Sequence, residues 1–117
     1  GICGNAVKEM VSLGSDPKDI LAAIGPCIGA CCYQVGEEVY TAFFEAGDFA
    51  ACFTPDTEQG KYLLDLTHAN RLVLERAGLA PEHIDEAHTC TRCHGEYFFS
   101  HRRMGAERGT MSAFITV

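Results

Sequence analysis

The sequence has 117 residues, of which 47% are hydrophobic and 21% charged, with a net charge of −7 at pH 7. This length and composition are typical of one globular domain with its own core. The acidic balance argues against a nucleic-acid partner, and no apolar run approaches the roughly 20 residues that span a bilayer, so we expect no membrane contact either.

The first half of the chain predicts a helix, a strand, a glycine-rich loop and a second helix. Residues 2–13 show helical spacing, and Gly14 suits a helix end. Residues 20–24 are continuously apolar, which favours a strand buried on both faces. Glycines at 25, 29 and 36 then predict a loop. The next helix is expected over residues 35–46, with one apolar face formed by Val35, Val39, Phe43 and Ala46.

The second half repeats this alternation. Residues 47–60 are rich in turn formers and predict a long, partly mobile connection before a strand at 62–64. Asp65 is a candidate N-cap for a helix that ends at Gly78. Strands are expected at 84–88 and, as a final buried strand, at 111–117. Alternating helices and strands without repeats indicate a layered α and β architecture.

The seven cysteines give information about compartment and chemistry. Their number is odd, and Cys31 and Cys32 are adjacent, so they cannot readily pair with each other. The chain is also apolar enough to fold without a disulfide framework. A reducing, cytoplasmic location is therefore expected, where cysteine acts as a small apolar residue, a nucleophile or a metal ligand.

The segment from Cys90 to Arg103 supports several kinds of chemistry. Cys90, Cys93 and His94 have the spacing of a haem-attachment site, although haem attachment needs export and the alternating pattern is unlike a helical haem domain. A cysteine of the glycine-rich loop beside His94 or His101 would instead form a nucleophilic thiolate pair. By composition alone, the simpler interpretation is that these cysteines are packing residues.

A zinc site is the other alternative. Structural zinc sites use pairs of thiolates separated by two to four residues. The sequence offers such pairs in two places, and a self-contained zinc-binding or thiol redox module would use Cys27, Cys31, Cys32, Cys90 and Cys93.

Three ordered segments resemble one known family. They are residues 20–39 (ILAAIGPCIGACCYQVGEEV), 61–72 (KYLLDLTHANRL) and 90–110 (CTRCHGEYFFSHRRMGAERGT). The chain is identified as a member of the YfiH-like family, also known as the laccase-domain or multicopper polyphenol oxidase family, or as purine nucleoside phosphorylases. The resemblance implies the α+β class, as part of a four-layer α-β-β-α sandwich with mixed sheets.

The same resemblance implies an activity for the intact protein. Family members are credited with metal-dependent phosphorolysis of adenosine, inosine and related nucleosides, with adenosine deamination and with phenol oxidation. Their cofactor is zinc or copper, and their small-molecule substrates are a purine nucleoside and phosphate.

The family's metal ligands, two His and one Cys, lie before the region represented here. One of these His residues opens a His-Ala-Gly-Trp-Arg-Gly motif, and this sequence has neither that motif nor any Trp. Residues 1–117 are therefore expected to be the C-terminal portion of one YfiH-like domain. We expect no metal ligand, no cofactor and no catalysis from this chain alone, and possible self-association through open strand edges.

The resemblance also gives candidate substrate-binding residues, while the catalytic residues stay unassigned. The glycine-rich loop could present backbone amides to an anionic oxygen, and paired arginines could bind phosphate with their forked donors. We expect one of the two arginines to contact substrate or phosphate, with an internal ion pair as the alternative. The candidates are Gly25, Gly29, Cys32, Tyr33, Arg102 and Arg103.

Overall fold

A computed structural model describes residues 1–116 of the chain. Its helices are α1 (Ile2–Ser12), α2 (Glu37–Ala46), α3 (Leu66–Arg76) and α4 (His101–Met104). Its strands are β1 (Ala22–Ile24), β2 (Gln34–Gly36), β3 (Phe53–Pro55), β4 (Lys61–Leu64) and β5 (Ile84–Glu86). Short 3-10 turns cover Pro17–Asp19, Ala50–Cys52, Pro81–His83 and Gly105–Glu107. None of the helices in residues 1–116 has the length and apolar character needed to cross a bilayer.

The strands form two small sheets of different kinds. β1 and β5 pair in parallel, with Ala22 opposite Ile84 and Ile24 opposite Glu86. The other sheet is antiparallel and has the order β2-β4-β3. This combination of helices with parallel and antiparallel sheets confirms the expected α+β class.

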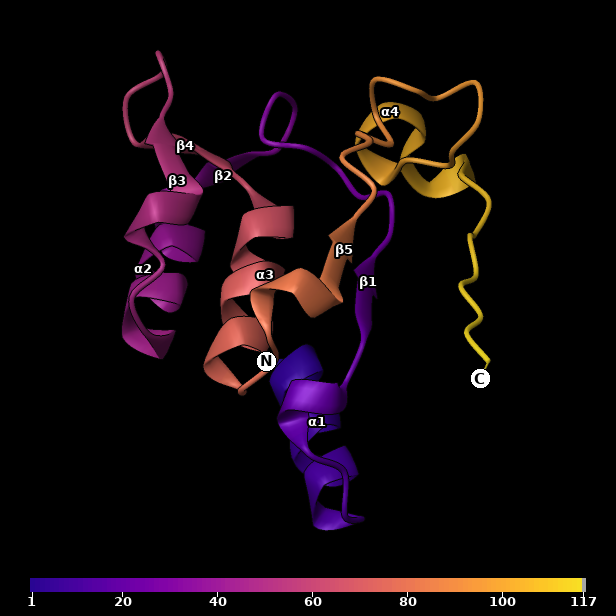
Figure 1. The fold of residues 1–117 in the computed structure, drawn as a ribbon. Helices are drawn as coiled ribbons and strands as arrows, with labels where there is room; N and C mark the ends of the chain where they lie inside the picture. The colour runs from indigo at the N-terminus through magenta and orange to yellow at the C-terminus, as the bar shows by residue number, and fades with distance from the viewer. Residues whose placement is uncertain (117) are drawn as a thin grey trace.

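Helix α3 lies between the two sheets and contributes to both apolar cores (Figure 1). Leu74 packs into the core beside β1 and β5, and Ala69 packs into the core beside the antiparallel sheet. Helix α1 packs against α3. The first core consists of Val7, Ile20, Leu74, Leu79 and Ile84, and the second of Val35, Phe49, Cys52, Leu64 and Ala69.

The ends of α3 follow directly from its sequence. The Asp65 carboxylate accepts a hydrogen bond of 2.9 Å from the backbone N–H of His68, which satisfies a donor that the first helical turn leaves free. At the other end Gly78 has φ +104°, a conformation that glycine adopts without steric cost. Both predicted helix signals are confirmed, and they fix where the chain enters and leaves the central helix.

Two predictions for the first half of the chain need correction. Residues 20–24 do not form a strand buried on both faces, because Leu21 is 69% exposed and Ala23 is also exposed. Strand β1 belongs to a two-stranded sheet, and its apolar contacts lie on the side of α1 and α3. Val35 lies in β2 rather than in the following helix, which begins after Gly36, whose backbone is extended.

The segment 47–60 is not one long connection. It contains the 3-10 turn Ala50–Cys52 and strand β3, which pairs with β4 through Phe53 and Leu64. β3 lies at the edge of its sheet, where Pro55 is tolerated because an edge residue need not donate a hydrogen bond to a second neighbour. The Gly and Pro content of the segment predicts a loop, so the sequence alone did not indicate this short strand.

The predicted final strand at 111–117 is wrong over the residues described. Residues 111–116 belong to neither sheet, and Phe114 and Ile115 are 95% and 82% exposed. In Figure 1 this tail extends beyond α4. An apolar pattern alone is not sufficient for a strand, which also needs a neighbouring strand to pair with. Val117 lies outside the described residues.

Candidate functional site

Parallel pairing of β1 with β5 brings two distant loops together. The carboxyl ends of parallel neighbours lie at the same edge of a sheet, so residues 25–33 and 87–98 leave it side by side. An isolated parallel bridge between Cys27 and Cys90 continues the pairing, and the backbone N–H of Thr91 donates to the carbonyl of Cys27 at 3.0 Å. The loops are therefore fixed to each other just beyond the strands.

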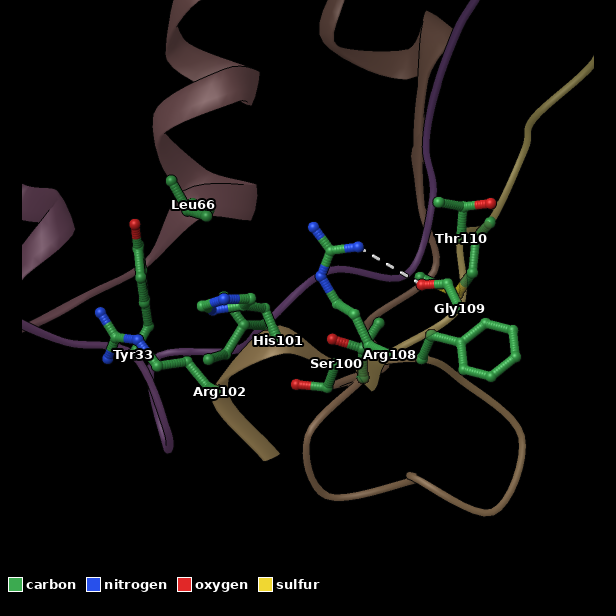
Figure 2. Close-up of a pocket in the computed structure, with 12 residues that line it drawn as sticks. Tyr33, Leu66, Ser100, His101, Arg102, Arg108, Gly109 and Thr110 are labelled. Carbon is green, nitrogen blue, oxygen red and sulfur yellow. Dashed lines mark hydrogen bonds between the residues drawn. The ribbon is translucent and has the colours of Figure 1, made fainter. Parts of the chain in front are cut away.

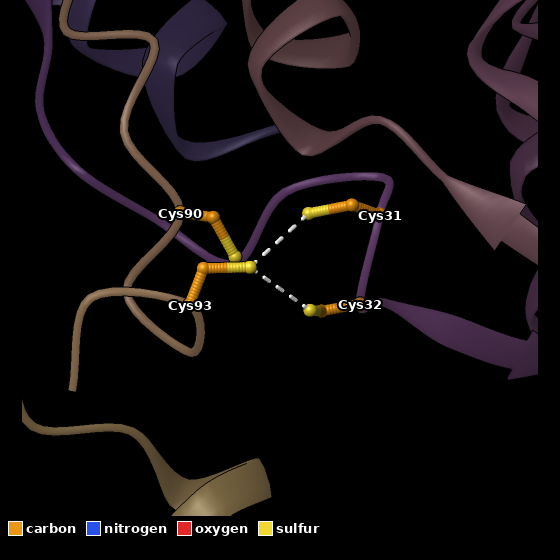
Figure 3. Close-up of side chains that lie close together, drawn as sticks. All are labelled: Cys31, Cys32, Cys90 and Cys93. Carbon is orange, nitrogen blue, oxygen red and sulfur yellow. Dashed lines mark hydrogen bonds between the residues drawn. The ribbon is translucent and has the colours of Figure 1, made fainter.

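Four thiols meet where these loops touch (Figure 3). The Sγ atoms of Cys31, Cys32, Cys90 and Cys93 all lie within 4.8 Å of one another. Cys93 is 3.7 Å from Cys31 and 3.5 Å from Cys32, measured between sulfurs. Cys27, which the sequence also offered as a ligand, contacts the Thr67 hydroxyl at 3.3 Å instead. None of the seven cysteines, all of which are described, forms a disulfide.

The local environment gives Cys90 and Cys31 different pKa values. Burial of Cys90 raises its pKa, but backbone N–H groups of Gly29, Cys93 and Arg92 oppose this effect and lower the pKa to about 6. Partial desolvation of the Cys31 sulfur, with hydrogen bonds to the other three thiols, raises its pKa to about 12. With this pKa, Cys90 is expected to be mainly a thiolate at neutral pH.

A cavity of about 510 Å³ lies beside the start of α4 and contains arginine and histidine side chains (Figure 2). Its volume is within the range of small-molecule pockets. Aromatic rings and small polar groups complete the wall. The lining residues are Ile28, Tyr33, Leu66, Thr91, Phe99, Ser100, His101, Arg102, Arg108, Gly109, Thr110 and Met111.

Arg102 is held against Tyr33 at this cavity. The centre of its guanidinium lies 4.9 Å from the centroid of the Tyr33 ring, a cation–π contact. Its Nη1 donates to the carbonyl oxygen of Gln34 at 2.8 Å. These two contacts orient the planar guanidinium, whose fork of five N–H donors suits a bidentate anion such as phosphate.

The predicted substrate-binding residues are placed in several different environments. Tyr33 and Arg102 line the cavity, whereas Cys32 belongs to the thiol cluster. The Gly29 amide, expected to face an anion, donates to Cys90 Sγ at 3.2 Å. Gly25 is exposed and does not line the cavity.

Arg103 is also outside the cavity wall, and its guanidinium lies against the backbone of Gly95. Two further residues of the wall, His101 and Arg108, were not among the substrate-binding candidates. His101 stands within the quoted C-terminal motif next to Arg102, so its position in the motif was a signal. Arg108 follows the helical turn and could be placed only once the path of the chain was known.

The donor atoms of this chain do not fit the ligand set that the family resemblance implies. Within residues 1–116, the four-cysteine cluster is the one group of three or more His, Cys, Asp or Glu side chains close enough to share an ion. It contains sulfur alone, whereas the implied catalytic site combines two imidazoles with one thiolate. The expectation that this chain alone provides no metal ligand stays a prediction, although the four cysteines are close enough to hold an ion.

Comparison with known proteins finds clear sequence relatives of this chain. It is 43% identical to the purine nucleoside phosphorylase YlmD of Geobacillus stearothermophilus, over 98% of this chain and 44% of that protein. It is 39% identical to the adenosine deaminase RL5 of an unknown prokaryotic organism, over 88% of this chain and 40% of that protein. The chain thus spans less than half the length of these relatives.

The fold agrees with these sequence matches. The crystal structure of Bacillus licheniformis YfiH superimposes with a TM-score of 0.82 at 36% identity, over 87% of this chain and 39% of that chain. Residues 1–117 match the family described as multi-copper polyphenol oxidoreductase laccase. The chain therefore belongs to this laccase-like, YfiH-type family.

Proposed function

We propose that the protein containing this chain catalyses phosphorolysis of purine nucleosides, and that this chain provides a phosphate-binding wall of the active site. The observation that supports the proposal best is the oriented guanidinium of Arg102 at a cavity of about 510 Å³, in a relative of named purine nucleoside phosphorylases. Arg108 and His101 add further N–H donors to the same cavity.

The reaction needs positive charge next to the phosphate. A phosphate oxygen forms a bond to C1′ of the ribose while the bond from C1′ to the purine nitrogen breaks, and the purine leaves with that electron pair and takes up a proton. Arg102 would hold the phosphate in position for this attack, which lowers the entropic part of the barrier. Tyr33 holds Arg102 from one side, and Phe99 offers an apolar surface for the base.

The catalytic metal implied by the family, zinc or copper, would be held by residues outside this chain. The roles proposed for Arg102, Tyr33 and Phe99 do not involve contact with that metal. The four thiols present here do not resemble its mixed imidazole and thiolate donors. Nothing in the cavity wall points specifically to phenol oxidation, while its cationic side chains favour an anionic co-substrate. Phosphorolysis uses such a co-substrate, whereas deamination of adenosine uses water.

The neighbouring arginines provide a matched test. In the complete enzyme, Arg102→Ala should raise the KM for phosphate by roughly tenfold to a hundredfold, because a charge-assisted contact is lost. Arg103→Ala removes the same charge outside the cavity and should change that KM less than about threefold. Inosine phosphorolysis, assayed at varied phosphate, measures both values.

Equal effects of the two variants would contradict the assignment to Arg102. Ammonia release from adenosine in the absence of phosphate, without any phosphorolysis of inosine or adenosine, would contradict the proposed reaction itself.

A further inference from the structure

The four-thiol cluster has no role in the proposed phosphorolysis. Its sulfurs do not line the cavity that contains Arg102, and its donors do not match the implied catalytic metal site. We propose that Cys31, Cys32, Cys90 and Cys93 bind one zinc ion in a closed site that joins the loop after β1 to the loop after β5. This site is separate from the catalytic metal and does not depend on the reaction proposed above.

The spacing between the sulfurs fits a tetrahedral zinc ion. With Zn–S bonds of about 2.3 Å, the edges of an ideal ZnS₄ tetrahedron are about 3.8 Å long. The two measured separations from Cys93, 3.7 Å to Cys31 and 3.5 Å to Cys32, are close to this edge. Since all four sulfurs lie within 4.8 Å of one another, small side-chain rotations suffice to reach the geometry.

Figure 3 shows how two segments bring their thiols together from opposite sides. In one loop, the N–H groups of Cys32 and Tyr33 both donate to the carbonyl of Gly29, at 2.9 and 3.0 Å, which turns the adjacent cysteines toward the partner loop. In the other, the N–H of His94 donates to the carbonyl of Cys90 at 3.1 Å and closes a turn around Cys90-x2-Cys93. The ligands are thus positioned by the backbone.

The backbone around Cys90 also suits a metal-bound thiolate. The Gly29 N–H donates to its Sγ at 3.2 Å. Hydrogen bonds from such neighbours hold metal ligands in place and stabilise their negative charge. A Cβ at position 29 would lie 3.3 Å from Cys31 Sγ and from Cys90 Cβ, so glycine permits this close approach.

Four sulfur donors favour zinc or an iron–sulfur type of centre, and a closed tetrahedron leaves no position for substrate. The site is therefore structural. Thr91, between two of the ligands, is 5% exposed and lines the cavity that contains Arg102. Zinc binding would fix the loop that forms this part of the cavity wall.

Zinc content, measured by elemental analysis, tests the site directly. The complete protein is purified under reducing conditions, and its zinc per chain is compared with that of Cys90→Ser/Cys93→Ser. The double variant should hold about one zinc ion fewer per chain, and any metal bound elsewhere cancels in the difference. Cys27→Ser and Cys52→Ser, which remove thiols outside the cluster, should retain the wild-type content.

Two measurements keep the test decisive if the double variant does not fold. Cys31→Ser changes an exposed side chain and should reduce zinc affinity at least tenfold while circular dichroism stays unchanged. In the wild-type protein, Co²⁺ replacing this zinc should show the intense sulfur-to-cobalt absorption of a four-thiolate tetrahedral site.

Three results would overturn the proposal. The first is equal zinc content in the wild type and both cluster variants, and the second is iron in place of zinc. The third is a disulfide between cluster cysteines with no zinc bound, in protein kept under reducing conditions, seen as a mass 2 Da lower than that of the reduced chain.

Discussion

The thiol cluster and the arginine cavity lie in neighbouring parts of the molecule but are built differently. All four candidate ligands of the cluster are present, on two loops that a β-bridge and a backbone hydrogen bond tie together. The cavity is lined largely by residues 99–111, where a four-residue helix is the longest regular element and the chain continues into an exposed tail.

This difference indicates which of the two regions we expect to bind its ligand without the rest of the complete protein. The cluster depends on the pairing of β1 with β5, which lies wholly within residues 1–116. The cavity wall has cationic donors, yet residues 111–116, which belong to the strand predicted at 111–117, are part of neither sheet. We therefore expect zinc binding to follow the β1-β5 scaffold and phosphate binding to require the complete enzyme.

The largest change in stability is expected in the core of the antiparallel sheet, to which α3 contributes Ala69. Leu64 is 1% exposed and packs in the core of the antiparallel sheet. Leu64→Ala should lower the free energy of unfolding by about 3 kcal/mol, since it removes buried methyl groups and leaves a cavity. Urea unfolding measures this value. Leu21→Ala is the control, because Leu21 is 69% exposed and should change stability by less than about 0.5 kcal/mol.

If the comparison is correct, Leu64→Ala should leave the zinc content of the folded protein unchanged. Loss of zinc from the folded variant would show that the cluster depends on the distant core rather than on the β1-β5 pairing.

A smaller effect is expected where the two cysteine loops approach most closely. Gly29→Ala places a Cβ 3.3 Å from Cys31 Sγ and from Cys90 Cβ, so these residues must move apart. Zinc affinity should fall by roughly tenfold, as observed when the surroundings of metal ligands are disturbed. Competition with a chromophoric chelator gives the affinity.

Gly25→Ala is the matched control, because a Cβ at that position meets no atom within 4 Å. An equal loss of affinity in both glycine variants would contradict the close-approach argument.

The smallest effect is expected at the N-terminus of α3. Asp65→Ala removes the hydrogen bond to the His68 N–H and should lower the free energy of unfolding by about 1 kcal/mol. Asp65→Asn keeps a capping oxygen and should cost less. Thermal unfolding of both variants provides the measurement, and equal destabilisation by Ala and Asn would show that charge rather than capping is responsible. Neither change should alter zinc content.

Local signals in the sequence were enough to predict α3, with Asp65 at its start and Gly78 at its end. They failed where pairing partners decide the structure. Strand β3 forms because Phe53 meets Leu64 across the sheet, and residues 111–116 form no strand although their composition favours one.

The candidate site, too, was predicted from the sequence only in part. The family resemblance identified Tyr33 and Arg102 as substrate-binding candidates, and both line the cavity. The spacing of the cysteines gave five possible zinc ligands, but it could not decide among them. Only the parallel register of β1 with β5, which joins residues some 60 positions apart, places Cys90 and Cys93 beside Cys31 and Cys32 and leaves Cys27 against Thr67.

The most direct test of the zinc site is X-ray absorption at the zinc edge of this 117-residue chain, purified under reducing conditions. We expect four sulfur neighbours at about 2.3 Å and no nitrogen or oxygen neighbour. Retention of no zinc, or a first shell that contains nitrogen or oxygen, would contradict the site formed by Cys31, Cys32, Cys90 and Cys93.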